Sequence, residues 1–296
     1  MAWDIRGKNV LVTGATSGIG LEASVELARR GARVTMVGRD RRKTEAAVAE
    51  VKARSGSGEV SFLLCDFSSQ AEIRRLAQDV LAGHGRLDVL VNNAGAVNKE
   101  RRLTVDGIET TFAVNHLGYF LLTNLLADLL VRSAPARVVS VASEAHRNAT
   151  LDFDDIGFER GYRIMRSYGR SKLANILFSN ELARRLAGTG VTSNSLHPGV
   201  VATNIWSGAP GWIKPVFQLL SRPFFLKPEE GASPIVHLAA SPEVDGVTGQ
   251  YFLRHKPVPP APLAQDEALA KRLWTVSAGM VGLPEDNLLE PGTLSL

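Results

Sequence analysis

The sequence has little of what marks disulfide-rich, secreted or membrane proteins. It contains one cysteine, Cys65, so an internal disulfide is excluded. Cys65 ends the apolar run VSFLLC, which indicates a buried core thiol rather than a catalytic one. No stretch reaches the apolar length of a membrane span, and the N-terminal residues MAWDIRGKNVLVTG lack the apolar core of a signal peptide. We therefore expect a soluble, cytoplasmic protein with no membrane span.

An excess of charge of one sign is also missing. The 34 Lys and Arg residues nearly balance the 30 Asp and Glu residues, which leaves a formal charge of +4 spread along the chain. No basic stripe with interleaved aromatic residues appears, so nucleic acid is not an expected partner. His116, His146 and His197 show no spacing typical of a ligand cluster, and we expect no metal site. These histidines are instead expected to be structural or to line a pocket.

What the sequence does contain is a regular alternation of short Val/Leu-rich runs and longer helical patterns. The expected strands cover residues 9–14, 33–38, 60–65, 87–93, 136–143, 191–198 and 249–253. The expected helices cover residues 18–30, 41–55, 70–83, 107–132, 167–186 and 228–240. This spacing is typical of βαβ units in a parallel sheet. The sequence therefore predicts an α/β fold, a single doubly wound Rossmann-type domain with a mainly parallel sheet of about seven strands.

Two segments break this rhythm, although no repeat or flexible linker divides the chain. We expect one domain over residues 1–256 and a C-terminal extension over residues 257–296 that packs on it, as a Pro-rich turn and an amphipathic helix. A partner surface is the alternative for that helix. Residues 204–227 are rich in Trp, Phe, Pro and Gly, and we expect a lid over an apolar substrate, with Trp206 and Trp212 in contact with it. A packed loop or an oligomer contact is the alternative for this lid.

The stretch LVTGATSGIGLE places a glycine-rich turn between the first strand and the first helix. Glycine suits a tight turn whose backbone must approach a pyrophosphate, and the helix that follows offers free N–H groups to the phosphates. Its position in the first βαβ unit strengthens the signal. The candidate phosphate-binding residues are Gly14, Thr16, Ser17, Gly18, Ile19 and Gly20.

Arg39 and Asp40 follow the second expected strand, where cofactor preference is commonly set. An arginine there suits a ribose 2′-phosphate, and an acidic residue suits a free 2′-hydroxyl. Because Arg39 lies at the expected distance after the glycines, NADP(H) is the preferred cofactor. Asp40 keeps NAD(H) as the alternative, and a solvated surface charge is the plain interpretation of Arg39.

Tyr168 and Lys172 lie four residues apart in the segment SYGRSKLANI. That spacing places them on one face of a helix. An ammonium near a phenol favours the phenolate, so the pair predicts a tyrosine with a lowered pKa that acts as an acid–base group. Alone, such a pair is equally well explained as surface decoration.

Six motifs occur in order along the chain: TGATSGIG, NNAG, AVNHLGYF, VVSVAS, YGRSK and HPGVVAT. With them the sequence resembles the short-chain dehydrogenases/reductases. The segments SKLANILFSNELARRL and PLAQDEALAKRLW resemble the retinol dehydrogenase and WW-domain oxidoreductase group, in its catalytic domain alone.

The resemblance implies a catalytic role for four residues. Tyr168 is expected as the general acid in reduction and the base in oxidation, and Lys172 as the group that lowers its pKa and binds the nicotinamide ribose. Ser143 is expected to hold the substrate oxygen, and Asn115 to hold a water that links Lys172 to solvent. The plain alternatives are a strand-end cap for Ser143 and a buried structural amide for Asn115. A Ser143–His146 dyad lacks any other sign of acyl transfer.

The resemblance also implies further contacts to the cofactor and the substrate. Asp66 and Phe67 match a pair that contacts adenine, and residues 93–95 are expected on its ribose side. The expected nicotinamide contacts are Pro198, Gly199, Val201 and Thr203. Residues 93–95 are Asn93, Ala94 and Gly95. Ala145 is a further candidate for contact with the substrate.

The function expected from these residues is hydride transfer between NADP(H) and a carbonyl or alcohol on an apolar molecule, such as a retinoid-, steroid- or fatty-aldehyde-like substrate. An NAD-linked alcohol dehydrogenase is one alternative. A regulatory protein that binds the cofactor without turnover is another, although such a protein usually lacks the Tyr, Lys or Ser. A homodimer or homotetramer is the expected assembly, through the helices at residues 107–132 and 167–186.

Overall fold

A computed structural model describes residues 3–199 and 226–284 of the chain. Nearly all of the predicted lid and the end of the C-terminal extension lie outside these residues. So do four residues predicted to contact cofactor or substrate, namely Val201, Thr203, Trp206 and Trp212.

The strands form one sheet in the order β3-β2-β1-β4-β5-β6-β7-β8. Their bounds are β1 Asn9–Thr13, β2 Arg33–Gly38, β3 Val60–Leu64, β4 Val89–Asn92, β5 Ala136–Val141, β6 Val191–His197, β7 Tyr251–Leu253 and β8 Lys256–Pro257. Each neighbouring pair from β3 to β7 is parallel, and β7 and β8 are antiparallel. The predicted doubly wound fold is confirmed, and all seven predicted strands form. The sequence pattern misses β8, because two residues that include a proline carry no alternation and fit only a sheet edge.

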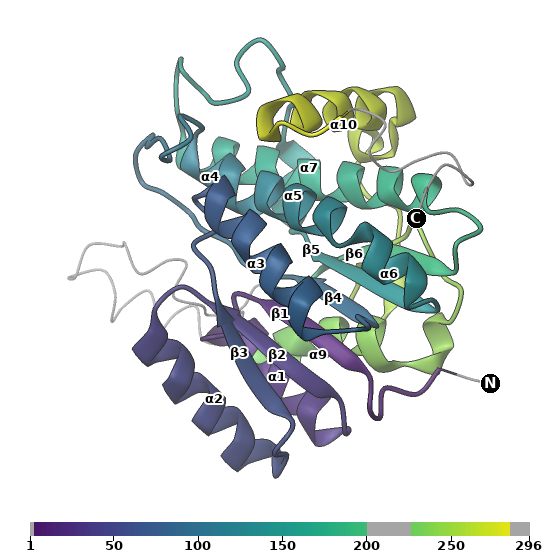
Figure 1. The fold of residues 1–296 in the computed structure, drawn as a ribbon. Coiled ribbons are helices and arrows are strands. Elements are labelled where there is room, and N and C mark those ends of the chain that lie inside the picture. Colours follow the sequence, from purple (N-terminus) through teal and green to yellow (C-terminus); the bar gives the residue numbers. More distant parts are fainter. Residues whose placement is uncertain (1–2, 200–225, 285–296) are drawn as a thin grey trace.

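Helices cover both faces of this sheet (Figure 1). One face carries α1 (Gly18–Arg29), α2 (Arg41–Ser55) and α9 (Pro228–Ala240). The other face carries α3 (Gln70–Gly83), α5 (Gly118–Leu125), α6 (Ala127–Arg132) and α7 (Ile164–Arg185), and α10 (Glu267–Val281) packs on the outside of α7. None of the helices in the described ranges is long and apolar enough to cross a bilayer.

Each face of the sheet has its own apolar core, and β1 contributes to both. Val10 and Val12 are buried on the side of α1 and α9, whereas Leu11 is buried on the side of α3 and α5. Successive side chains of a strand point to opposite faces, so a strand covered on both sides is apolar throughout. This is why the strands read as continuous Val/Leu runs in the sequence.

The helix predicted over 107–132 is wrong at its start and in its continuity. Gly107 lies in a turn with φ +75°, and the Glu109 carboxylate caps the helix by accepting two backbone N–H groups at 2.8 Å. The helix therefore starts with α4 (Thr110–Phe112). A π-helical turn (Ala113–Leu117) then separates α4 from α5.

The helix α7 begins three residues before its predicted start at Ser167. Ser167 is a residue type that commonly caps helices, which places the predicted start too late. Its hydroxyl instead donates to the buried Glu109 carboxylate at 3.2 Å. Tyr168 consequently lies in the second turn of α7 rather than at its second residue.

Candidate active site

Most of the predicted site residues follow the carboxyl end of a strand, so one edge of the sheet gathers them. In chain order, β1 is followed by Gly14, β2 by Arg39, β3 by Asp66, β4 by Asn93, β5 by Ser143 and β6 by Pro198. The strand order reverses between β1 and β4. A crevice at such a reversal is where ligands bind in open parallel α/β sheets.

The glycine turn after β1 lies very close to the end of β4. Gly14 has φ +64°, and a β-carbon there would lie 2.7 Å from the Ala94 Cα. A β-carbon at Gly20 would lie 2.4 Å from Asn93 Nδ2 and 2.5 Å from the Gly14 carbonyl oxygen. Both positions are therefore restricted to glycine by contacts between distant segments.

Hydrogen bonds lock the same two segments together. Asn93 Nδ2 donates to the carbonyls of Thr13 at 2.8 Å and Gly14 at 3.1 Å. The Thr13 hydroxyl oxygen accepts the backbone N–H groups of Asn93 at 2.9 Å and Ala94 at 3.0 Å. Sequence analysis misses the role of Thr13, since no spacing pattern shows which strand end a hydroxyl will meet.

The start of α1 fits the pyrophosphate of a dinucleotide. Ser17 is its N-cap residue, yet its side chain makes no capping hydrogen bond, whereas Asp40 caps α2. Gly18, with φ +58°, opens the first turn of α1, whose N–H groups and dipole favour an anion. Thr16 packs toward Gly38 at the end of β2, and Ile19 is half-buried against the core of that face.

Arg39 is the first residue after β2, and its side chain is 77% exposed. Its Nη1 lies 3.9 Å from Asp66 Oδ2. The neighbouring Asp40 carboxylate accepts the Lys43 N–H at 2.9 Å and so serves as the cap of α2. Arg39 is thus free to meet a ligand at this strand end, whereas Asp40 already has a structural partner.

The adenine-side pair has one polar member and one packed member. Asp66 Oδ1 accepts both the backbone N–H and the hydroxyl of Ser68. The Phe67 ring is buried against α5, where a β-carbon on Gly118 would lie 2.7 Å from it. Their contact with adenine stays a prediction.

Asn115 lies in the π-helical turn and is fully buried. Its Oδ1 accepts the Ala96 N–H at 2.7 Å, and its Nδ2 donates to the Ala96 carbonyl and the Ser171 hydroxyl, each at 3.0 Å. These bonds match the plain alternative of a structural amide, which joins the segment after β4 to α7. The water-holding role stays a prediction.

Ser143 follows β5 and caps a short 3₁₀ helix (Glu144–Asn148) by accepting the Ala145 N–H at 3.2 Å. The hydroxyl therefore acts as a cap, but of this 3₁₀ helix rather than of the strand end. A β-carbon on Gly169 of α7 would lie 2.8 Å from the Ala145 carbonyl oxygen. This glycine lets α7 approach the turn closely enough for Tyr168 to interact with the Ser143 hydroxyl.

Lys172 is buried on the same face of α7, with its Nζ 5.6 Å from the centre of the Tyr168 ring. Its Nζ donates to the Val141 carbonyl at 2.9 Å, and Asn175 Nδ2 donates to the same oxygen at 3.2 Å. The last residue of β5 therefore orients two polar side chains of α7. Ser143, Tyr168 and Lys172, which are far apart in the chain, meet at one point of the sheet edge.

The prediction that the pKa of Tyr168 is lowered is wrong when only the residues of the protein act on it. Burial raises the pKa of the Tyr168 phenol, and the interaction with the Ser143 hydroxyl offsets only part of that effect. Burial also lowers the pKa of Lys172 to about 7, because a desolvated ammonium is disfavoured. Sequence spacing identifies the pair but carries no information about its desolvation, which here is the main cause of both pKa shifts.

Pro198 and Gly199 follow the last residue of β6. Gly199 has φ +90°, and a β-carbon there would lie 2.3 Å from the Leu226 side chain. The positive φ favours glycine at this position, whereas the Leu226 side chain could move aside. Their predicted contact with nicotinamide is not tested by these facts.

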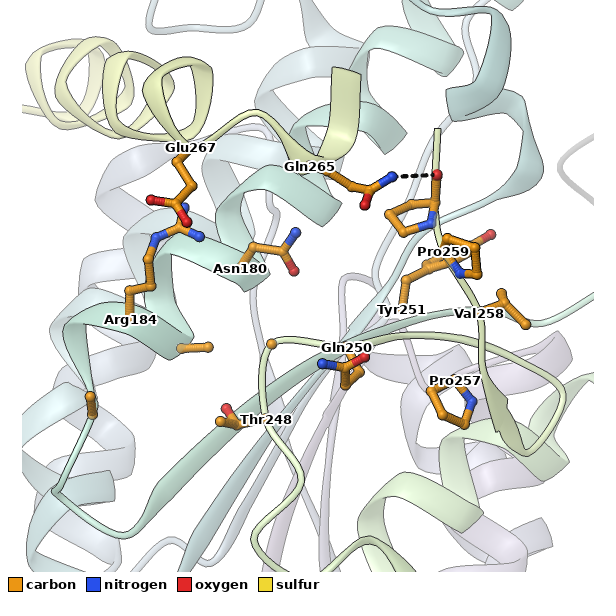
Figure 2. A pocket seen from close by; sticks show the side chains of 14 residues that line it. Asn180, Arg184, Thr248, Gln250, Tyr251, Pro257, Val258, Pro259, Gln265 and Glu267 are labelled. Carbon is orange, nitrogen blue, oxygen red and sulfur yellow. Dashed lines mark hydrogen bonds between the residues drawn. The ribbon is translucent and has the colours of Figure 1, made fainter. Parts of the chain in front are cut away.

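A cavity of about 770 Å³ lies away from this group, between α7 and the C-terminal segment (Figure 2). Asn180, Arg184 and Tyr251 line it together with consecutive prolines. None of the predicted site residues borders this cavity. The chemistry of the protein is therefore assigned to the sheet edge, where the buried titratable groups lie.

The histidines make protein contacts, and among the described residues no group of His, Cys, Asp and Glu could hold a metal ion. His116 bonds with Ser277 at 2.8 Å, and His146 contacts backbone atoms through both ring nitrogens. The His146 ring therefore does not pair with the Ser143 hydroxyl, which argues against a Ser–His dyad.

A glycine turn at the strand reversal, together with a half-buried serine and tyrosine and a buried lysine, places the protein in the class of nucleotide-dependent oxidoreductases. The model of the family described as short chain dehydrogenase matches residues 8–213. The chain belongs to this family, and it acts on CH–OH or C=O groups with a nicotinamide dinucleotide as cofactor.

Two curated relatives show which members of the family the chain is similar to. It is 46% identical to retinol dehydrogenase 14 of Homo sapiens over 294 residues, which cover 94% of this chain and 88% of the relative. It is 42% identical to retinol dehydrogenase 13 of Homo sapiens over 295 residues, with coverages of 97% and 88%.

Solved structures have the same fold over most of the chain. A crystal structure of a putative uncharacterized protein from Mycobacterium Paratuberculosis matches with a TM-score of 0.77 at 32% identity, covering 95% of this chain and 96% of that one. The Pseudomonas aeruginosa RhlG/NADP active-site complex matches with a TM-score of 0.68 at 28% identity, covering 90% and 98%.

Proposed function

We propose that this oxidoreductase uses NADPH to reduce the carbonyl group of an apolar aldehyde or ketone, with Tyr168 as the proton donor. The observation that carries the proposal is the half-buried Tyr168 side chain, whose phenol interacts with Ser143, with the buried Lys172 on the same face of α7. A phenol is protonated at neutral pH and can give its proton to a developing alkoxide, which is a far stronger base than a phenolate.

Arg39 supports the choice of NADPH. It is exposed directly after β2, where a cationic guanidinium suits a 2′-phosphate. The acidic neighbour that would favour NADH, Asp40, is engaged as the cap of α2. The solved relative in complex with NADP is consistent with this preference.

Each residue of the group has a distinct task in the proposed reaction. The Ser143 hydroxyl donates a hydrogen bond to the carbonyl oxygen, on which negative charge develops. Tyr168 then gives its proton to that oxygen. Lys172 has one donor on the Val141 carbonyl, which leaves its remaining donors for the ribose hydroxyls. When bound, the nicotinamide supplies the hydride and, once oxidised, a positive charge that lowers the pKa of Tyr168.

Asn115 stabilises the site through hydrogen bonds to two neighbouring segments. Its side chain fixes the segment after β4 against Ser171, the residue that precedes Lys172. Single-turn π segments such as the one that contains Asn115 are frequent at functional sites. We assign Asn115 the task of holding the segment after β4 against α7. Binding the predicted water is its second proposed task.

An apolar, retinoid-like carbonyl is the substrate class that the named relatives favour, since two of them are retinol dehydrogenases. The aromatic residues of the segment 204–227 are suited to cover such a molecule.

The proposal is tested with the purified chain, NADPH or NADH, and a panel of retinoid, steroid and fatty carbonyl compounds beside a small hydrophilic aldehyde. Oxidation of the reduced cofactor is followed by its absorbance. We expect turnover with NADPH and a higher kcat/KM for the apolar members. Binding of NADPH without turnover of any panel member overturns the proposal, and a preference for NADH overturns its cofactor.

A further inference from the structure

His146 lies three residues after Ser143 and is almost fully buried in the 3₁₀ helix that Ser143 caps. Its Nδ1 is 2.7 Å from the carbonyl oxygen of Ser143 itself. Its Nε2 is 3.0 Å from the backbone nitrogen of Ala261, which belongs to the C-terminal segment. The ring therefore joins the backbone of a predicted catalytic residue to a segment more than one hundred residues away.

The chemistry of these two partners fixes the tautomer of the ring. A carbonyl oxygen can only accept, so Nδ1 carries the proton, and a backbone N–H can only donate, so Nε2 is the unprotonated acceptor. His146 is thus neutral with both nitrogens in use. Burial lowers its pKa, which is consistent with this state.

The C-terminal segment is itself attached to the rest of the site frame. Asn180 of α7 donates to the Ala264 carbonyl at 3.1 Å, and the Val258 N–H donates to the Tyr251 carbonyl at 2.8 Å. Figure 2 shows this segment passing over Tyr251 of β7 beside Asn180. Because α7 also carries Tyr168 and Lys172, the segment bridges the Ser143 turn and the helix of the other two residues.

We propose that His146 is a positioning residue for Ser143. By holding the Ser143 carbonyl and the Ala261 N–H at once, it fixes the turn against the C-terminal segment and so sets where the Ser143 hydroxyl lies relative to Tyr168. The inference rests on the proposed function, because it requires the Ser143 hydroxyl to act on the substrate oxygen.

The first test replaces the backbone N–H of this arrangement with a proline ring carbon, which also displaces the His146 ring. Ala261→Pro deletes the N–H that His146 accepts, and Ala261 already has φ −57°, which proline adopts. We expect kcat to fall about 10- to 100-fold, since small misplacements of a catalytic group have effects of that size. The Kd for NADPH is expected to stay unchanged.

Two further variants accompany it. His146→Asn keeps a donor near the Ser143 carbonyl but is too short to reach Ala261, and we expect the same direction of change in kcat. Gln265→Ala is the matched control, because it breaks the bond from Gln265 Nε2 to the Pro260 carbonyl in the same segment. We expect Gln265→Ala to leave kcat unchanged.

The pH profile separates positioning from simple structural support. Protonation of His146 Nε2 breaks the bond to Ala261, so kcat of the wild type is expected to fall on the acid side. In Ala261→Pro that bond is already absent, so this acid limb is expected to disappear. The charged or titratable groups that face the ring are Glu144 and Arg147 on its own 3₁₀ helix, Tyr251 on β7 and His197 at the end of β6.

The outcomes distinguish the inference from the function on which it rests. No turnover by the wild type overturns the proposed function and this inference with it. Turnover by the wild type with kcat and acid limb unchanged in both variants overturns the inference alone. Loss of the fold in both variants, seen by circular dichroism, also overturns it, because His146 is then a structural residue.

Discussion

The ends of β1 and β5 lie at the same edge of one sheet, yet they are built in different ways. The turn after β1 is made of backbone in close contact, where β-carbons at Gly14 and Gly20 would meet other atoms at 2.7 and 2.4 Å. The group after β5 is made of polar side chains: the buried Lys172 and Asn175 share one carbonyl, and the half-buried Tyr168 interacts with Ser143.

This difference determines how each region is disturbed. The glycine turn is sensitive to added volume, because its neighbours are main-chain atoms that cannot move aside cheaply. The group after β5 is sensitive to charge and hydrogen bonding, because its ionisable side chains are desolvated. Substitutions at the two strand ends should therefore separate into steric effects on stability and chemical effects on rate.

Ser143→Ala is expected to have a large effect on the rate through the group after β5. Removing one donor to a developing oxyanion lowers kcat by about 10²- to 10³-fold, and the Kd for NADPH stays unchanged. Loss of the cap on the 3₁₀ helix costs about 1 kcal/mol of stability at the same time. Steady-state kinetics and thermal unfolding measure the two effects separately.

Ser140→Ala is the matched control for that variant. Ser140 is buried in β5, and its hydroxyl finds no hydrogen-bond partner among the described residues. Its removal is expected to leave kcat unchanged. An equal loss of kcat in both variants would contradict the assignment of Ser143.

Lys172→Met is expected to raise the stability of the protein near pH 7 by an amount on the order of a few kcal/mol. The pKa of Lys172 is about 7 in the folded protein, whereas an unburied lysine, as in the unfolded chain, has a pKa of 10.5. Between these two pH values the unfolded chain binds the proton that the folded chain releases, so this group adds stability as pH rises. Below about pH 7 Lys172 is charged in the folded protein as well, and burial of the ammonium then lowers the free energy of unfolding by its full amount.

Denaturant unfolding of wild type and Lys172→Met at a series of pH values checks this prediction. The difference between the two proteins should shrink from pH 7 towards pH 10.5. A difference that is constant over this range would mean that burial does not lower the pKa of Lys172. The variant is expected to be inactive throughout.

Gly20→Ala tests whether the glycine turn after β1 is sensitive to added volume. The added methyl group meets Asn93 and the Gly14 carbonyl, so we expect a loss of about 1–3 kcal/mol in stability and a higher KM for the cofactor. Gly279→Ala in α10 is the control, because nothing lies within 4 Å of its β-carbon. That control should gain about 0.5–1 kcal/mol, since alanine is the better helix former. Equal stability of the two variants would contradict the claim that close contacts restrict position 20 to glycine.

Arg39→Ala is expected to have the smallest effect and to act on cofactor choice alone. Loss of an exposed cation at the 2′-phosphate should raise the KM for NADPH about tenfold, which corresponds to about 1.4 kcal/mol, with no change for NADH. Arg42→Ala, which removes another exposed cation in the first turn of α2, is the control. An unchanged preference for NADPH in Arg39→Ala would contradict the role of this residue.

The sequence predicts the glycine turn well, because its signal is local. Each of the seven predicted strands forms, and the turn residues from Gly14 to Gly20 lie where their spacing places them. The helix over 107–132 is predicted poorly, since its start depends on the Glu109 carboxylate and its π-helical turn on packing around Asn115. Neither depends on helical periodicity.

The side chains of the site were identified from motif and spacing, but not their electrostatic state. Tyr168 and Lys172 share a face of α7 as predicted, whereas the pKa of each is set by burial among residues distant in the chain. The contacts of Thr13, Gly169 and His146 were missed for the same reason. Of these, Gly169 had a usable signal, since it stands within the motif YGRSK that must pack closely against another turn.

The central claim is that Tyr168 gives the proton in carbonyl reduction, and Tyr168→Phe tests it most directly. The substitution removes one hydroxyl and keeps the ring. With a carbonyl substrate that the wild type turns over, kcat is expected to fall about 10²- to 10⁴-fold while NADPH binds as in the wild type. An unchanged kcat in a folded Tyr168→Phe variant that binds NADPH would contradict the account.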